Sequence, residues 1–249
     1  MKVKHILSFA LLLCTLTGFA QSRVSADALG AVQYDIRYKL GALNTKVADG
    51  TITLENSTWN GQSVLHSHAD IQAKSVFKLF MNAAYIVDLY LTRTEVEPVY
   101  YINPFKKNGQ DGKVEFTYDR SGRKIDFVAV RPPAAPVSDT FPLDGKTMDL
   151  LSTLQYARFL NLSEGSSMSL KLLKSGKVIP ATLTFIGKDM DRFPGREAER
   201  LQLTMTGGGL MENGSGSIIT VWRSAGSDRR ILGLEVALSS GTMIVTSRQ

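Results

Sequence analysis

The sequence predicts a mainly β fold: a strongly curved antiparallel sheet or half-barrel with one or two short covering helices. Three observations favour it. Apolar residues alternate with polar or small ones along many short stretches, as in strands that bury one face. Clusters of turn-forming residues separate these stretches at the spacing of hairpins. Only two segments have helical spacing. A sheet with one apolar face must hide that face and its edges, and curling achieves both.

The alternating segments run through most of the chain. In chain order, their apolar positions are Val32, Tyr34, Ile36, Tyr38 and Leu40; Ile52 and Leu54; Leu65, Ala69 and Ile71; Val114, Phe116 and Tyr118; Ile125, Phe127 and Ala129; Met168, Leu170 and Leu172; Ile179, Ala181, Leu183 and Phe185; Leu201, Leu203 and Met205; Leu232, Leu234, Val236 and Leu238; Met243 and Val245. The dipeptide Asn60-Gly61 is a strong turn signal between two of them. Successive strands are therefore expected to pair as hairpins.

Three segments interrupt this pattern. Residues 82–91 have apolar side chains at helical spacing and are predicted to form a short helix. Residues 147–160 predict a better helix, with Thr147 as its cap and Asp149 near its positive end. Its apolar stripe consists of Leu150, Leu151, Leu154, Ala157 and Leu160. Residues 131–142 contain four prolines and are predicted to be an extended loop between the two halves of the domain.

The first 20 residues have the three-part pattern of a cleaved secretory signal. Lys2 and Lys4 precede an apolar run, and Gly18-Phe19-Ala20 places small residues at the cleavage site. The remainder, residues 21–249, is predicted to be a single β-rich domain in the periplasm, without a later segment long enough to span a membrane. Cys14 is the only cysteine, and an outer-membrane lipoprotein attached through it is the alternative.

The amino-acid composition limits which classes of function the protein can have. Hydrophobic residues make up 43% of the chain, enough for a packed core, and loss of the signal would leave no cysteine for disulfides. The formal charge of +6 is spread along the chain without the basic runs and interleaved aromatics of nucleic-acid-binding proteins. We therefore expect no nucleic-acid partner. The favoured interpretation of these charges is a solvated surface, and weak peripheral contact with an anionic membrane surface is the minor alternative.

Three segments resemble one family. They are Tyr34-x-Ile36-x-Tyr38-x-Leu40-Gly41; Thr147-Met148-Asp149-Leu150-Leu151-Ser152-Thr153-Leu154-Gln155-Tyr156-Ala157-Arg158; and Val221-Trp222-Arg223-Ser224 followed by Asp228-Arg229-Arg230-Ile231. In this order they resemble an exported bacterial family catalogued as domain of unknown function 3108. The resemblance implies an exported, β-rich protein with no assigned reaction, so it supplies no catalytic residues. The chain departs from the family pattern at 225–228 and 231–232.

The pair His66-x-His68 is the strongest candidate for a metal-binding or catalytic motif. Residues two apart in a strand point to the same face, so the two imidazoles could share a metal ion, with Asp70 as a third ligand. However, Leu65, Ala69 and Ile71 mark the opposite face as the core. The favoured interpretation is that the histidines lie on the polar face of the strand and that the chain holds neither a metal nor another cofactor.

Catalytic motifs are weak. Asp189-x-Asp191 resembles the start of a calcium loop or an acid–base pair, but the later ligands are out of register, and a solvated loop is favoured. Gly207-Gly208-Gly209 lacks the following residues of a phosphate loop. No histidine follows His68 to serve a serine nucleophile. Arg158 is expected to have a structural role beside the apolar stripe of its helix.

These observations predict a non-enzymatic envelope protein whose curved sheet holds an apolar or lipid-like ligand. The first alternative is an envelope scaffold or protein-interaction module without a ligand cavity, whose partner is an unknown envelope component. The least favoured alternative is a hydrolase that uses Asp189 and Asp191 together with another acid. A hollow lined by apolar side chains would favour the carrier, and a filled interior would favour the scaffold.

Overall fold

A computed structural model describes residues 24–74, 84–107, 109–174, 176–206, 216–238 and 240–248 of the chain. The predicted secretory signal, Cys14 and the glycines at 207–209 lie outside these residues. Within them the chain forms one 15-stranded sheet and one α-helix. The predicted fold class is confirmed.

The helices and strands follow one another in a simple order. A short 3-10 helix, η1, precedes the first strand, and the α-helix, α1, lies between the ninth and tenth strands. Their bounds are η1 (Ala26–Ala28), β1 (Gly30–Leu40), β2 (Leu43–Trp59), β3 (Gln62–Ala73), β4 (Ala84–Thr92), β5 (Pro98–Lys107), β6 (Gln110–Asp119), β7 (Lys124–Val130), β8 (Val137–Pro142), β9 (Thr147–Met148), α1 (Leu150–Phe159), β10 (Ser167–Lys174), β11 (Lys177–Asp189), β12 (Ala198–Thr206), β13 (Gly216–Ser224), β14 (Ile231–Leu238) and β15 (Gly241–Ser247).

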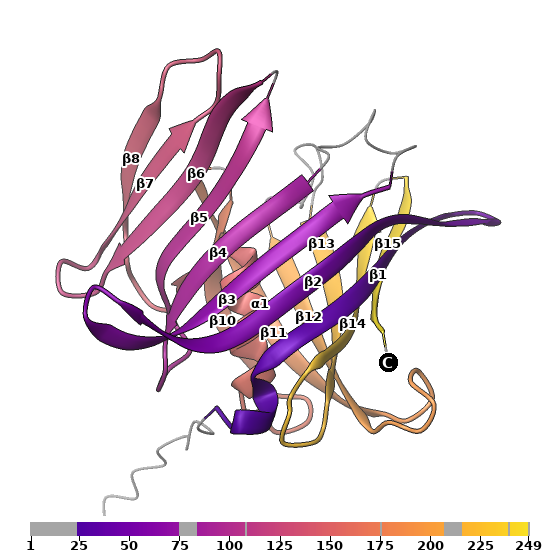
Figure 1. The fold of residues 1–249 in the computed structure, drawn as a ribbon. Coiled ribbons are helices and arrows are strands. Elements are labelled where there is room, and N and C mark those ends of the chain that lie inside the picture. The colour runs from indigo at the N-terminus through magenta and orange to yellow at the C-terminus, as the bar shows by residue number, and fades with distance from the viewer. Residues whose placement is uncertain are drawn as a thin grey trace, which may run out of the picture.

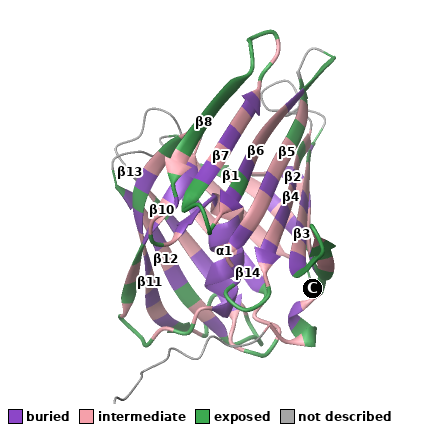
Figure 2. Cartoon of the chain, turned by 90° about the vertical axis from the view of Figure 1, so that its left-hand side faces the viewer, coloured by how far each residue is buried: buried purple, intermediate pink, exposed green. Residues whose placement is uncertain are grey.

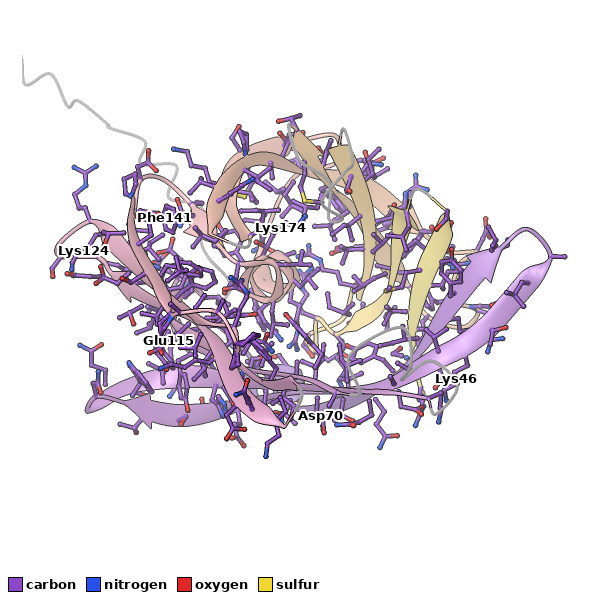
Figure 3. All side chains as sticks on the ribbon, turned by 90° about the horizontal axis from the view of Figure 1, so that it is seen from above. Lys46, Asp70, Glu115, Lys124, Phe141 and Lys174 are labelled. Atoms are coloured by element: carbon purple, nitrogen blue, oxygen red, sulfur yellow. The ribbon has the colours of Figure 1, made fainter. Side chains whose placement is uncertain are left out.

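The sheet is built almost entirely from neighbours in sequence. Its strand order is β8-β7-β6-β5-β4-β3-β2-β1-β15-β14-β13-β12-β11-β10-β9, so β1 and β15 join the two ends of the chain at the centre. All pairs are antiparallel except the two-residue β9, which runs parallel to β10. The sheet curls around α1, as the ribbon in Figure 1 and the view from above in Figure 3 show. Curling places the helix on the apolar inner face of the sheet.

The turn signal between β2 and β3 acts as predicted. Asn60 and Gly61 have φ angles of 48° and 78°, so both central residues are in the left-handed region. Asparagine and glycine adopt this region at low cost, and such a turn matches the twist of paired strands. Trp59 and Gln62 then pair across the turn and fix the register of the longest hairpin.

The prediction of a helix over residues 82–91 is wrong. The described part of this segment belongs to β4, which pairs with β3 on one side and β5 on the other. Val87, Leu89 and Leu91 alternate and are fully buried, whereas the residues between them face outward. Ile86, Val87 and Tyr90 gave an apparent helical spacing. A strand is favoured because the segment is rich in β-branched and aromatic residues, and because its buried residues alternate along one face.

The proline-rich segment is only partly a loop. Residues 132–134 form a turn, but Val137–Pro142 forms β8, an edge strand paired with β7. Proline lacks an N–H donor, so it is disfavoured where a strand pairs on both sides and is tolerated at an edge or a strand end. Pro142 ends β8 opposite Lys124. The loop prediction over residues 137–142 is therefore wrong.

The core lies between the inner face of the sheet and α1 (Figure 2). One cluster of buried side chains joins the inner faces of β3–β7 to one side of α1, through residues that include Leu89, Phe116 and Phe159. A second cluster joins β10–β14 to the other side, through Leu183 and Leu203 among others. The helix thus connects the two arms of the curl. None of the described helices has the length and apolar character needed to cross a membrane.

Candidate functional site

The start of α1 is fixed by Asp149. Its carboxylate accepts a hydrogen bond from the Ser152 backbone N–H at 2.9 Å, and also contacts the Ser152 hydroxyl. Tyr118 Oη donates to the same carboxylate at 3.3 Å. Asp149 is therefore the N-cap, and the prediction that Thr147 caps the helix is wrong: Thr147 lies in β9, where its hydroxyl donates to the Asp144 carbonyl. Burial raises the pKa of Asp149, although the hydrogen bonds oppose this shift.

The end of α1 is capped by an arginine from β13. Arg223 Nη1 donates to the carbonyls of Arg158 at 3.0 Å and Leu160 at 2.7 Å, and also contacts that of Ala157. Its Nη2 lies 2.7 Å from Glu199 on β12, and its side chain is only 2% exposed. The last carbonyls of a helix have no partner within the helix, so a cation placed there stabilises its end.

Arg158 connects the same helix end to η1 and to the turn between β13 and β14. Its guanidinium donates to the carbonyls of Ala28, Asp228 and Arg229, at 2.6, 3.3 and 2.9 Å, and to Gln155 Oε1 at 2.8 Å. Burial lowers the pKa of Arg158 to about 10. The expected structural role fits this geometry, in which the partners of the guanidinium are carbonyl and amide oxygens.

A cavity of about 520 Å³ lies above the start of α1, between the inner faces of β4–β6 and β10–β12, and opens to solvent. Most of its lining is apolar. The apolar lining residues are Leu150 and Leu151 from α1, Leu172 and Leu173 from β10, Ile179 from β11, Met205 from β12, and Phe105, Val114 and Phe116 from β5 and β6. The opposed arms of the curl thus leave an apolar hollow that the helix does not fill.

Polar groups in the cavity are few. Tyr85 and Tyr101 line it with hydroxyls that lie 3.2 Å apart, and burial raises the pKa of both. Arg131 and Lys174 add two cationic side chains, Asp149 adds the carboxyl group of the N-cap of α1, and Asn103 adds an amide. Arg131 is exposed, and its guanidinium makes no hydrogen bond or ion pair within the described residues. The cavity therefore combines an apolar surface with two cationic side chains and the buried carboxyl group of Asp149. The sequence did not indicate that these residues share one cavity, because they come from eight separate segments.

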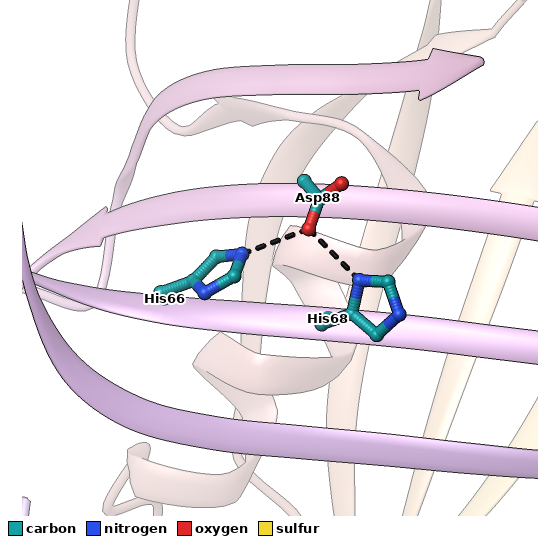
Figure 4. A group of neighbouring side chains, drawn as sticks. All are labelled: His66, His68 and Asp88. Atoms are coloured by element: carbon teal, nitrogen blue, oxygen red, sulfur yellow. Dashed lines mark hydrogen bonds and ion pairs between the residues drawn. The ribbon is translucent and has the colours of Figure 1, made fainter.

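The structure places His66 and His68 on the outer face of the sheet, together with Asp88 (Figure 4). Asp88 Oδ1 lies 2.9 Å from His66 Nε2 and 2.8 Å from His68 Nδ1. Asp70 shares their strand and lies on the outer face (Figure 3), but its carboxylate contacts Gln72. Asp88 comes from β4, in register with His68, and the helix predicted for that segment concealed this proximity.

Hydrogen bonds to Asp189 order the loop whose sequence resembles a calcium loop or an acid–base pair. Asp189 Oδ2 accepts from Trp222 Nε1 at 2.8 Å, and its Oδ1 accepts from the backbone N–H groups of Asp191 and Arg192. These hydrogen bonds, led by that from Trp222, lower the pKa of Asp189. Asp191 is exposed. Asp189 therefore orders its loop against β13.

Comparisons with known proteins identify a family and two distant folds. The family model described as protein of unknown function DUF3108 matches residues 33–244. No curated protein matches the chain. A β-barrel-like protein of domain of unknown function DUF1849 from Brucella abortus has 9% identity and a TM-score of 0.49, with 88% of this chain and 95% of that chain covered. Lipoprotein LppX from Mycobacterium tuberculosis has 13% identity and a TM-score of 0.30, with 92% of each chain covered.

Proposed function

This chain belongs to DUF3108, a family of proteins of unknown function, and we propose that it is a non-enzymatic protein that binds an apolar or lipid-like ligand. The observation that carries the proposal is the hollow between the two arms of the curled sheet. Its volume of about 520 Å³ falls in the range of small-molecule sites, and its lining is mostly leucine, isoleucine, methionine and phenylalanine.

The position of the hollow supports a binding role. In a protein that only needs a stable core, facing side chains interdigitate and leave few voids larger than a water molecule. Here the inner surface below the hollow is packed in this way around α1. The space above the start of the helix stays open, although apolar side chains line it from both arms. Covering that apolar surface with a ligand removes it from water, which drives association.

The polar lining supports a ligand with one charged or polar end. Arg131 and Lys174 give the lining two positive charges against the one buried carboxyl group of Asp149, and the hydroxyls of Tyr85 and Tyr101 supply hydrogen bonds. An amphiphile with an apolar chain and an anionic head group complements this distribution. The hollow also favours a carrier over the alternative of a scaffold without a cavity. The proposed location is the periplasm, where a protein of this type keeps an apolar molecule out of water.

Cavity filling tests the proposal. The full chain is titrated with cis-parinaric acid, an anionic polyene fatty acid whose fluorescence rises in apolar surroundings. We expect saturable binding that is weakened at least tenfold by Leu150→Trp, which fills the hollow from the half-buried first residue of α1. The matched control is Ile218→Trp, at a 45% exposed position of β13 outside the cavity lining.

Native mass spectrometry of protein purified from its own host provides a second readout. A bound mass that is present in the wild type and absent from Leu150→Trp supports the carrier. An apo mass, together with probe binding that Leu150→Trp leaves unchanged, would overturn it.

A further inference from the structure

Three side chains with metal-binding atoms converge on the outer face of β3 and β4, on the other side of the sheet from the hollow. His66 and His68 project from β3, and Asp88 lies opposite His68 on β4. One ligand atom from each residue lies within 4.8 Å of the other two. The antiparallel register produces this arrangement, because alternate residues of a strand share a face.

His66 lies between two carboxylates. Its Nε2 is 2.9 Å from Asp88 Oδ1, and its Nδ1 is 3.2 Å from Glu55 Oε1 on β2. A neutral imidazole has one N–H and one lone pair, so a neutral His66 satisfies only one of these carboxylates. A cation bound to Nε2 resolves the conflict: Nδ1–H donates to Glu55, and the Nε2 lone pair and Asp88 both face the positive charge.

The ring of His66 is held in the orientation that a metal ligand needs. Tyr90, its register partner on β4, stacks on it with ring centroids 4.7 Å apart and an interplanar angle of 16°. Glu55 holds the far nitrogen of the ring. A carboxylate that accepts from the second nitrogen of a ligating histidine fixes its tautomer and orientation, and raises its basicity.

The three ligand side chains are shielded but open to an ion. Their exposed fractions are 17% for His66, 37% for His68 and 29% for Asp88. The remaining side faces solvent, which supplies further ligands as water.

We propose that His66 Nε2, His68 Nδ1 and Asp88 form a binding site for a divalent transition-metal ion of the zinc type, oriented by Glu55. Two nitrogens and one carboxylate oxygen are a common donor set for zinc, and water occupies the fourth position. Ligands about 2.0–2.2 Å from a tetrahedral ion lie about 3.4 Å apart. The present separations of 2.9 and 2.8 Å therefore open by about half an ångström when the ion enters.

Isothermal titration calorimetry on the full chain tests the site. We expect one zinc ion to bind per chain, and no heat with magnesium or calcium, which prefer sites built entirely from oxygen. Asp88→Asn and His68→Ala are each expected to weaken zinc binding by at least roughly tenfold, and Glu55→Gln by about tenfold. Asp70→Asn is the matched control, because this aspartate shares the strand face but contacts Gln72.

Thermal unfolding with and without zinc provides a readout that also reports folding. Zinc is expected to raise the Tm of the wild type and of Asp70→Asn, but not that of Asp88→Asn. If Asp88→Asn does not fold, His68→Ala gives the same comparison from the other strand. Zinc binding that neither Asp88→Asn nor His68→Ala weakens, or the absence of zinc binding to the wild type, would overturn the site.

Discussion

Arg223 Nη1 lies 3.0 Å from the carbonyl oxygen of Arg158, so an arginine of β13 caps a helix from the middle of the chain. Arg158 in turn donates to carbonyls of η1 and of the turn before β14. The three segments that carry the family resemblance meet here, because Tyr34 of β1 also donates to the carbonyl of Ile231 at 3.1 Å. Residues of the three family motifs therefore supply hydrogen bonds that hold α1 inside the curled sheet.

Replacement of the capping arginine is the first test of this relationship. Arg223→Leu is expected to lower the free energy of unfolding by about 3 kcal/mol, because it leaves the last carbonyls of α1 buried without a donor. Urea unfolding followed by circular dichroism measures the loss. The control is Arg192→Leu, which breaks a more exposed ion pair with Glu235 and is expected to cost about 1 kcal/mol or less. Equal losses in the two variants would contradict the capping role.

Two substitutions of the N-cap residue Asp149 distinguish the effect of its hydrogen bonds from the effect of its negative charge. Asp149→Ala is expected to destabilise the protein by about 2 kcal/mol, because Ser152 and Tyr118 lose their acceptor. Asp149→Asn is expected to cost less than about 1 kcal/mol, since asparagine caps equally well and removes a buried charge. Chemical denaturation at neutral pH compares the two. A larger loss for Asn than for Ala would show that the negative charge, and not the cap, is required.

The strands could be predicted from the sequence because each needs only a local pattern. The alternation of Ile125, Phe127 and Ala129 is visible in any window that contains them, and all three are buried in β7. Residues 82–91 misled the same approach because two of their outward residues, Ile86 and Tyr90, also have apolar character. Ile86 and Tyr90 cover the outer face of β4, so periodicity alone fits both structures.

The metal-binding candidate and the cavity depend on how strands pair and on how the sheet curls. Neither property can be predicted from a short stretch of sequence. His66 and His68 were visible as a pair, but Asp88 joins them only because β3 and β4 pair with His68 opposite Asp88. The cavity is harder to predict than the histidine site, because it also depends on the curvature of the sheet. Phe105 and Met205 face the same space only after the sheet has curled around α1. The sequence indicated a ligand cavity as one hypothesis, but not which residues line it.

Alkaline titration tests the environment of Tyr34, which is buried within β1. Burial raises the pKa of Tyr34 to about 12 from its usual value of 10.0, with Arg158 and Arg230 acting in the opposite direction. Because the folded state holds this proton more tightly, its stabilising contribution is complete below pH 10 and is lost as the pH rises toward 12. The loss is about 2 kcal/mol by the upper end of that window.

Tyr34→Phe is the variant that isolates this contribution. It loses the hydrogen bond to Ile231, which costs about 1 kcal/mol at neutral pH. Its stability is expected to fall less steeply than that of the wild type above pH 10, because one titrating group is gone. Urea unfolding at several alkaline pH values measures both slopes. Parallel slopes would mean that Tyr34 ionises in the folded state as easily as in the unfolded chain.

The cation at the cavity gives the sharpest test of the ligand class. Arg131→Glu is expected to weaken binding of a long-chain fatty acid by roughly fivefold or more, because it replaces an attraction of about 1 kcal/mol with a repulsion. Binding of the fatty alcohol of the same chain length is expected to change less than twofold. Displacement of a fluorescent probe measures both affinities. Arg93→Glu, an exposed arginine just after β4 that lies outside the cavity lining, is the control for net charge. Equal weakening of the acid and the alcohol would indicate that Arg131 shapes the cavity and does not recognise a head-group charge.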